Sequence, residues 1–316
     1  MSRLNPAVRG PAISGRRWRP GGLAFGEALT GYLFVSPWII GFVLFTLVPM
    51  AAALYFSLTD FDLRRPDDIH FVGLDNYVRL LGDRNVHVSV WVTIRFLVLS
   101  VPLTLIAALG VAVLLNSRNV VGRTLLRTLF YMPMQIPLVA STLIWAAVLN
   151  SQTGWVNRGL AGIGVEGPDW IGDPGWVLVT FALLGLWGIG NAMLVFIAGL
   201  QGVPTELYDA AKVDGAGAWT RFRRITLPLI TPVIFYNLLI GLVVGFQYFI
   251  QAYVLKNGIP DDSTLFFNVN LYREAFTFNQ LGYASALAWV LFLVILSVTI
   301  VLLLWSRRWV YYAAER

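Results

Sequence analysis

Six long apolar stretches dominate the sequence and restrict the folds that it can adopt. They cover residues 29–58, 90–115, 125–149, 176–200, 231–254 and 284–306. A helix needs about 20 mostly apolar residues to cross roughly 30 Å of hydrocarbon, so each stretch is long enough to span a bilayer. Only 13% of the 316 residues are charged, against about 25% in a typical soluble domain. The pattern predicts an all-α polytopic membrane protein with six transmembrane helices.

Basic residues indicate the orientation of these spans. If the N-terminus lies inside the cell, the inner segments carry roughly twice as many arginine and lysine residues as the outer ones. We therefore expect both termini on the cytoplasmic side of the plasma membrane. Residues 1–24, rich in Gly, Pro and Arg, are expected to form a disordered basic tail, and residues 25–316 a membrane domain. The net charge of +6 lies at the ends of the apolar stretches, so it indicates topology and not a nucleic-acid-binding face.

The inner segment 201–230 is too long for a simple connection between two spans. Pro204 suits the first turn of a helix. Glu206 and Asp209 follow in the first turns, where carboxylates are favoured by the positive end of the helix dipole. Gly215 can end this helix in a left-handed conformation. We expect a second short helix after it, with large apolar residues at three-residue spacing.

The same segment resembles the signature loop of the inner-membrane component of binding-protein-dependent ABC importers. That signature reads Glu-Ala-Ala, three residues, Gly, nine residues, and then Ile-x-Leu-Pro. The matching residues are Asp209, Ala210, Ala211, Gly215, Ile225, Leu227 and Pro228. Their spacing agrees throughout, and the one departure is the shorter aspartate in place of the leading glutamate. The two alanines would leave a flat helix face, against which another surface can pack closely.

Other segments are similar to the carbohydrate-type permeases of this family. Residues 71–77 resemble the outer segment after the first span of sugar permeases, and residues 131–133 resemble part of their third span. Residues 256–260 resemble the Thr-Gly-Gly-Pro turn after the fifth span, with two departures. The nearest group is the maltose-transporter subunit that lines the sugar site.

The resemblance implies a type I ABC importer permease fold within a heteromeric complex. The loop around Glu206 would form coupling helices that an ATPase subunit holds. The implied partners are a second, related permease, two ATPase subunits, an extracytoplasmic sugar-binding protein and membrane lipid, with no nucleic acid. The chain has no Gly-x-x-x-x-Gly-Lys-Ser/Thr motif, so ATP and Mg²⁺ would be held by the ATPases. We expect no cofactor, no metal and no catalytic residue in this chain. The alternative for the loop is an ordinary amphipathic connector.

The apolar stretches contain no Asp, Glu, His or Lys, whereas proton- or sodium-coupled carriers usually place ionisable groups there. This favours an external energy source such as an ATPase. Alignment with the maltose-transporter subunit implies sugar contacts from Trp187, Gly188, Asn191, Gly245 and Tyr248, with Gln247 adjacent to them. Gln251 is a further candidate. Aromatic faces can stack on sugar rings, and amides can bind sugar hydroxyls.

Helix packing is the alternative reading of these positions. Gly241 and Gly245 have the four-residue spacing of closely packed membrane helices, and Asn or Gln often binds a neighbouring helix. Gln135 lies beside two prolines, and we interpret it as a group that satisfies freed backbone carbonyls.

Two other functions stay open. A permease of the same fold could carry a non-sugar solute, such as a glycerophosphodiester or a polyamine, although a charged solute favours ionisable groups near its site. A polytopic membrane enzyme would need a cluster of catalytic residues, and the sequence shows none.

Overall fold

The computed structural model describes residues 23–117, 120–256 and 261–311. Most of the predicted tail 1–24 and the predicted turn at 257–260 therefore lie outside the described residues. Contacts between residues divide the chain into two units, Met1–Ala52 and Ala53–Arg316, which are described separately. Apart from one isolated bridge between Thr59 and Phe71, the regular structure of the described residues is helical. The all-α prediction is confirmed.

The first apolar stretch forms one long helix. α1 (Leu23–Phe42) continues through a π-helical turn, η1 (Val43–Leu47), into α2 (Val48–Ser57). The part Glu27–Ser57 is long and apolar enough to cross a membrane. Pro49 lacks an N–H, and its ring crowds the carbonyl one turn earlier. The wider π-turn directly before Pro49 gives that carbonyl room and lets the helix continue.

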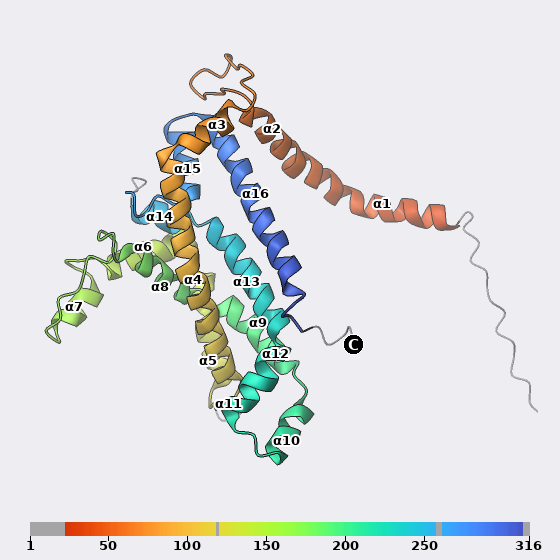
Figure 1. The fold of residues 1–316 in the computed structure, drawn as a ribbon, viewed down its shortest axis with the longest axis vertical. Helices are drawn as coiled ribbons and strands as arrows, with labels where there is room; N and C mark the ends of the chain where they lie inside the picture. Colours follow the sequence, from red (N-terminus) through yellow and green to blue (C-terminus); the bar gives the residue numbers. More distant parts are fainter. Residues whose placement is uncertain (1–22, 118–119, 257–260, 312–316) are drawn as a thin grey trace, which may run out of the picture. The chain divides into compact units, whose positions relative to one another are not determined.

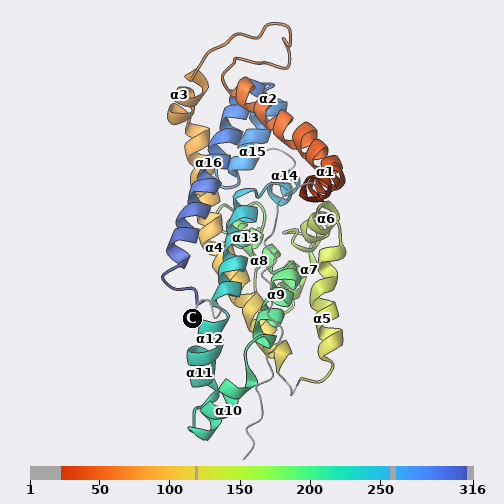
Figure 2. The same ribbon diagram turned by 90° about the vertical axis from the view of Figure 1, so that its right-hand side faces the viewer.

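Three further spans run through the second unit. α4 (Arg84–Asn116) packs against α13 (Thr231–Phe246), and α13 packs against α16 (Leu281–Ser306). Figures 1 and 2 show these three helices running lengthwise through the unit. In the described part of the chain, four helices can span a membrane by length and composition, and up to six if each of two bent pairs is one span. The number agrees with the six predicted spans.

The third predicted span is sharply bent. α5 (Arg123–Tyr131) runs into a 3₁₀ turn, η2 (Met132–Gln135), and α6 (Leu138–Val148) then leaves at 99° to the first part. Pro137 precedes α6, where the ring of a proline ends the preceding helix and its missing N–H needs no partner. Both prolines of this span lie at the interruption, Pro133 in η2 and Pro137 directly before α6.

The fourth predicted span, 176–200, contains a bend that no proline in the sequence marks. α8 (Val177–Trp187) and α9 (Gly190–Gln201) meet at a bend of 55°. At this bend the chain lies close to the third span, since a β-carbon on Gly190 would lie 2.6 Å from the carbonyl oxygen of Phe130 and 2.8 Å from the Cα of Tyr131. Only glycine allows this approach.

The fifth span also departs from a continuous helix. α13 ends at Phe246, the backbone turns at Gln247 and Tyr248, and α14 (Ile250–Leu255) resumes after Phe249, whose φ and ψ are −143° and −62°. The sequence has no proline at this break. α14 packs against α6, so the segments that follow the interruptions of the third and fifth spans lie together.

The signature loop and the short helices α3 (Asp75–Gly82) and α15 (Phe267–Tyr272) lie at opposite ends of this unit (Figures 1 and 2). In the loop, α10 (Thr205–Val213) is followed by the short elements α11 (Ala218–Arg221), η3 (Phe222–Thr226) and α12 (Leu227–Leu229). The remaining described helices are α7 (Trp155–Ala161), between α6 and α8, and the π-helical η4 (Arg273–Thr277), between α15 and α16.

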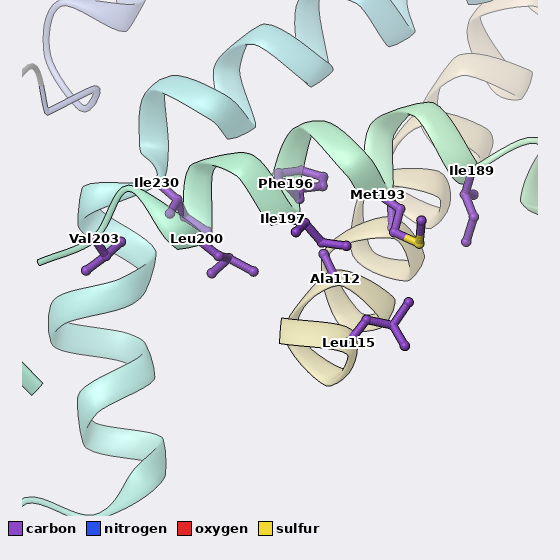
Figure 3. Close-up of a cluster of buried hydrophobic side chains, with 10 residues drawn as sticks. Ala112, Leu115, Ile189, Met193, Phe196, Ile197, Leu200, Val203 and Ile230 are labelled. Atoms are coloured by element: carbon purple, nitrogen blue, oxygen red, sulfur yellow. The ribbon is translucent and has the colours of Figure 1, made fainter. Parts of the chain in front are cut away.

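A buried apolar cluster fixes both ends of the loop (Figure 3). Val203 lies just before the first helix of the loop and Ile230 just after its last, and both are buried in the same cluster. The cluster also contains Phe196 and Leu200 of α9 and Leu115 at the end of α4. The loop is therefore anchored at both ends to two membrane-spanning segments.

Candidate functional site

A cavity of about 940 Å³ lies among the spans of the second unit. Its walls come from α4, the bend between α5 and α6, the bend between α8 and α9, the break between α13 and α14, and α15. All seven residues that the sequence suggests for substrate contact line it, namely Trp187, Gly188, Asn191, Gly245, Gln247, Tyr248 and Gln251. The interruptions of the spans thus place these residues around one space.

Aromatic rings form two parts of the cavity wall. Trp187 meets Trp145 of α6 edge to face, with ring centroids 5.3 Å apart. The ring of Tyr248 packs against Phe96 at 4.3 Å and Phe266 at 4.9 Å. Such contacts fix the orientation of each ring. Trp187 keeps 44% of its surface exposed, so it can still offer a face to a solute.

The polar groups of the cavity are amides and hydroxyls, and every described lining residue is uncharged. The side chains of Asn191 and Gln251 make no hydrogen bond with the described residues, so their donors and acceptors can bind a solute. Gln247 folds back, and its Nε2 donates to the carbonyl of Val243 at 3.2 Å. The hydroxyl of Tyr248 is buried and has no hydrogen-bond partner among the described residues.

Two of the candidate glycines differ in their surroundings. A β-carbon on Gly245 would clash with the side chain of Leu97 on α4, and one on Gly241 would lie 3.5 Å from Val101. Gly245 therefore lies close to α4, whereas a β-carbon on Gly241 would make only an ordinary van der Waals contact. Gly188 has no such neighbour, since the nearest atom to its β-carbon position is the carbonyl oxygen of Gly185 at 3.7 Å.

The cavity also holds residues that the sequence did not single out as contacts. Gln135 was interpreted as a partner for backbone carbonyls, but its side chain makes no such hydrogen bond with the described residues and lines the cavity instead. Trp145 and Asn268 line it as well. A tryptophan in a proline-broken span is a signal that could have suggested Trp145. Asn268 lies outside the predicted spans, and only the folded chain brings it to the cavity.

The loop residues adopt the predicted local structure. Glu206 lies in the first turn of α10, and Lys212 donates to Asp209 at 2.7 Å within the same helix. Gly215 has φ of +74°, the left-handed conformation expected at the helix end. Among the other signature residues, Ala210 and Pro228 are exposed, Ala211 and Leu227 are half-buried, and Ile225 packs against the cluster of Figure 3.

Large apolar side chains are exposed on the same loop. Leu207 and Val213 on α10 and Trp219 on α11 are exposed, Val213 at 89%. Trp219 stacks on Phe222 with ring centroids 5.6 Å apart. Exposed apolar groups beside the flat alanine positions form a surface suited to another protein.

No group of three or more His, Cys, Asp or Glu residues is placed to hold a metal ion in the part of the chain that the structure describes. Of the two histidines, His70 lies in the segment between the first two spans and His87 lies in the first turn of α4. His70 faces Asp60 and Asp68, at 3.3 and 3.5 Å.

Comparisons with known proteins agree with this arrangement. Residues 100–311 match the family described as binding-protein-dependent transport system inner membrane component. The chain is 39% identical over 294 residues to the probable ABC transporter permease protein YesP of Bacillus subtilis, covering 92% of this chain and 94% of the relative. It is 33% identical over 282 residues to the trehalose/maltose transport system permease protein MalF of Thermococcus litoralis, and the alignment covers 89% of this chain and 95% of the relative.

A further relative and a solved structure are also similar to this chain. The arabinooligosaccharides transport system permease protein AraP of Bacillus subtilis is 31% identical over 287 residues, with 90% of each chain covered. Among solved structures, a chain of a bacterial ABC transporter involved in the import of the acidic polysaccharide alginate has a TM-score of 0.76. It is 23% identical and covers 90% of this chain and 97% of its own length, which shows a common fold.

Proposed function

Because the chain belongs to the family of inner membrane components of binding-protein-dependent transport systems, we propose that it is a permease subunit of an ATP-driven importer of a di- or oligosaccharide. The observation that carries this proposal is the neutral, aromatic-walled cavity between the interrupted spans. Its volume of about 940 Å³ lies near the upper end of ordinary ligand pockets. Relatives named for trehalose/maltose and arabinooligosaccharide transport support the same substrate class.

The residues of the cavity fit the chemistry of a sugar. A sugar ring presents C–H groups that pack on an aromatic face, and Trp187 and Tyr248 supply such faces. Its hydroxyl groups both donate and accept hydrogen bonds, and the amides of Asn191, Gln247 and Gln251 can do the same. Gly188 lets a ring approach the backbone at the bend of the fourth span. Gly245 acts indirectly, by allowing α13 to pack on α4.

The signature loop is proposed to receive the energy of ATP. In this account an ATPase subunit holds α10 at Glu206, Asp209, Ala210 and Ala211, and the turn at Gly215 sets the direction of the second arm. The second arm carries Ile225, Leu227 and Pro228 to the start of the fifth span. Because Val203 and Ile230 fix the loop to α9 and α4, a movement of the loop shifts the walls of the cavity.

The complete complex is proposed to contain a second permease, two ATPases and an extracytoplasmic sugar-binding protein. ATP and Mg²⁺ are bound by the ATPases, and this chain carries out no catalytic step. Both termini and the signature loop lie on the cytoplasmic side, and lipid covers the exposed apolar faces of the spans. Closure of the ATPases on ATP moves the loops and opens the cavity outward to receive sugar, and hydrolysis restores the inward-facing state.

The second candidate function is import of a charged solute, such as a glycerophosphodiester or a polyamine, by the same fold. A phosphate or ammonium group in a cavity needs a charged or closely matched partner. The described lining residues are all uncharged, and this favours a neutral solute.

An uptake assay separates the two candidates. The complex, purified through a tag on this chain, is reconstituted in proteoliposomes with its binding protein and with ATP on the side of the ATPases. Labelled maltose, trehalose, an arabinooligosaccharide, glycerophosphocholine and spermidine are offered in turn. We expect ATP-dependent uptake of at least one sugar and none of the charged solutes. Uptake of a charged solute without any sugar would overturn the proposal.

A further inference from the structure

The break in the fifth span leaves a backbone carbonyl that its own helix cannot satisfy. α13 ends at Phe246, and the turn that follows uses the carbonyls of Val244 and Gly245 for the N–H groups of Gln247 and Tyr248. Among the described residues, no backbone N–H donates to the carbonyl of Gln247 itself. Polar backbone groups at membrane depth need a partner from elsewhere in the protein or from a solvated cavity.

Asn268 of α15 supplies that partner. Its Nδ2 donates to the carbonyl oxygen of Gln247 at 3.1 Å. Asn268 is 21 residues away in the sequence and lies outside the predicted spans. This hydrogen bond therefore connects a segment beyond the spans with the backbone between Gln247 and Tyr248.

α15 is itself held firmly by the longest span. The backbone N–H of Phe267 donates to Oγ1 of Thr93 on α4 at 3.0 Å, and Thr93 in turn donates to the carbonyl of Ser89 at 2.7 Å. Phe266 and Phe267 are both buried, and the ring of Phe266 contacts Phe96 of α4 at 5.2 Å. Asn268 thus projects from a backbone whose position is fixed relative to α4.

We infer that Asn268 is a positioning residue for the substrate cavity. By holding the Gln247 carbonyl, it fixes the turn from which the side chains of Gln247 and Tyr248 reach the cavity. The inference rests on the proposed function, because it assigns Asn268 a role in how that cavity binds sugar. It also makes α15, at the far end of the unit from the signature loop, a mechanical support of the binding site.

The test uses Asn268→Asp, which keeps the shape of the side chain but removes the donor, and Asn268→Ala, which removes the amide. Each is combined with Ser141→Cys, which places the only thiol of this chain in the cavity wall at a residue with no assigned sugar contact, because the sequence has no cysteine. The assembled complex is treated with a thiol reagent at increasing concentrations of the sugar that the wild type transports fastest. The quantity measured is the sugar concentration that halves the labelling rate.

We expect this half-protecting concentration to rise roughly 3- to 10-fold in both Asn268 variants, as the loss of one hydrogen bond that orders a site implies. Asn76→Ala is the matched control, since the amide of Asn76 donates to the carbonyls of Ser57 and Thr59 away from the cavity. It is expected to lower the thermal stability of the complex without changing the half-protecting concentration.

Three results would overturn the inference. One is an unchanged half-protecting concentration in both Asn268 variants, and another is an equal rise in Asn76→Ala. The third is failure of both Asn268 variants to assemble, which would assign the residue to folding alone. If sugar gives no protection even with Asn268 intact, the proposed function fails instead, so the two failures are distinguishable.

Discussion

The hydroxyl groups of Tyr208 and Thr226 lie 2.8 Å apart and form a hydrogen bond across the signature loop. Tyr208 belongs to α10 and Thr226 ends η3, so the bond joins the two arms of the loop on either side of Gly215. Thr226 is buried, and Tyr208 packs against the apolar cluster of Figure 3. This hydrogen bond connects the two arms, so a displacement of one arm also displaces the other.

Tyr208→Phe is expected to weaken coupling while sparing the fold. The substitution keeps the ring but removes one hydroxyl, and the loss of a hydrogen bond of this kind costs about 1 kcal/mol. Sugar transported per ATP hydrolysed should fall, with ATP hydrolysis itself retained. Tyr55→Phe is the control, because the exposed Tyr55 makes no hydrogen bond through its hydroxyl with the described residues. If Tyr208→Phe transports as much sugar per ATP hydrolysed as the wild type, the hydrogen bond between the two arms is not needed for coupling.

Gly215→Val is expected to uncouple the transporter more strongly. At φ of +74° a β-carbon is unfavourable by roughly 1–2 kcal/mol, and a β-branched side chain is worse. The turn should shift, so that ATP hydrolysis continues while transport falls. Gly217→Val is a matched control in the same loop, because Gly217 has φ of −65° and open space around its β-carbon position. Equal transport in both variants would contradict the role assigned to the Gly215 turn.

The sequence predicts the spans well because their signal is local. Each span needs only a run of apolar residues, and Pro133 and Pro137 mark the bend of the third. The breaks at Gly190 and at Gln247 could not be predicted in the same way. At the first, the Phe130 carbonyl, about 60 residues earlier in the sequence, lies against Gly190, and at the second, Asn268 binds the carbonyl of Gln247.

The candidate site is likewise only partly predictable from the sequence. Trp187, Gln247 and Tyr248 could be named from a resemblance and from their residue types. Gln135 was predicted to bind backbone carbonyls freed by the prolines. The sequence gives no sign that the bend between α5 and α6 places this side chain in the cavity wall. The position of Gly245 against Leu97 likewise depends on the packing of two spans that are distant in the chain.

Trp187→Ala is expected to reduce sugar uptake by up to about 10-fold, as the loss of an aromatic contact implies. The amount of assembled complex should stay the same, because Trp187 is 44% exposed and lies at the end of α8. Uptake and assembly are measured on the same preparations. Trp155→Ala is the control, since Trp155 on α7 is 77% exposed and does not line the cavity. Loss of assembly in Trp187→Ala would favour the packing role.

Glu274→Gln is expected to stabilise the protein at neutral pH. Burial raises the pKa of this carboxyl, the charge of Arg79 opposes that shift, and Asp83 adds to it. Because the pKa is raised in the folded state, the folded protein is favoured when Glu274 is protonated. Stability is lost as the pH rises from the ordinary value of 4.5 through the raised pKa.

The measurement is the thermal unfolding temperature of the purified complex at pH 7.5 and at pH 4.5. Glu274→Gln should unfold at a higher temperature than the wild type at pH 7.5, and the difference should shrink at pH 4.5. Glu166→Gln, on an exposed loop, should show no difference at either pH. A lower unfolding temperature for Glu274→Gln at pH 7.5 would mean that the ionised carboxylate stabilises the fold.

The central claim is that the cavity between the interrupted spans holds the transported sugar. It is tested most directly by thiol labelling of Gln251→Cys in the complex with its binding protein, stalled by a non-hydrolysable ATP analogue. Ser151→Cys, on the exposed segment before α7, serves as the control thiol. The transported sugar is expected to slow labelling of Gln251→Cys and to leave labelling of Ser151→Cys unchanged. Equal labelling of Gln251→Cys with and without sugar, in a complex that transports that sugar, would contradict it.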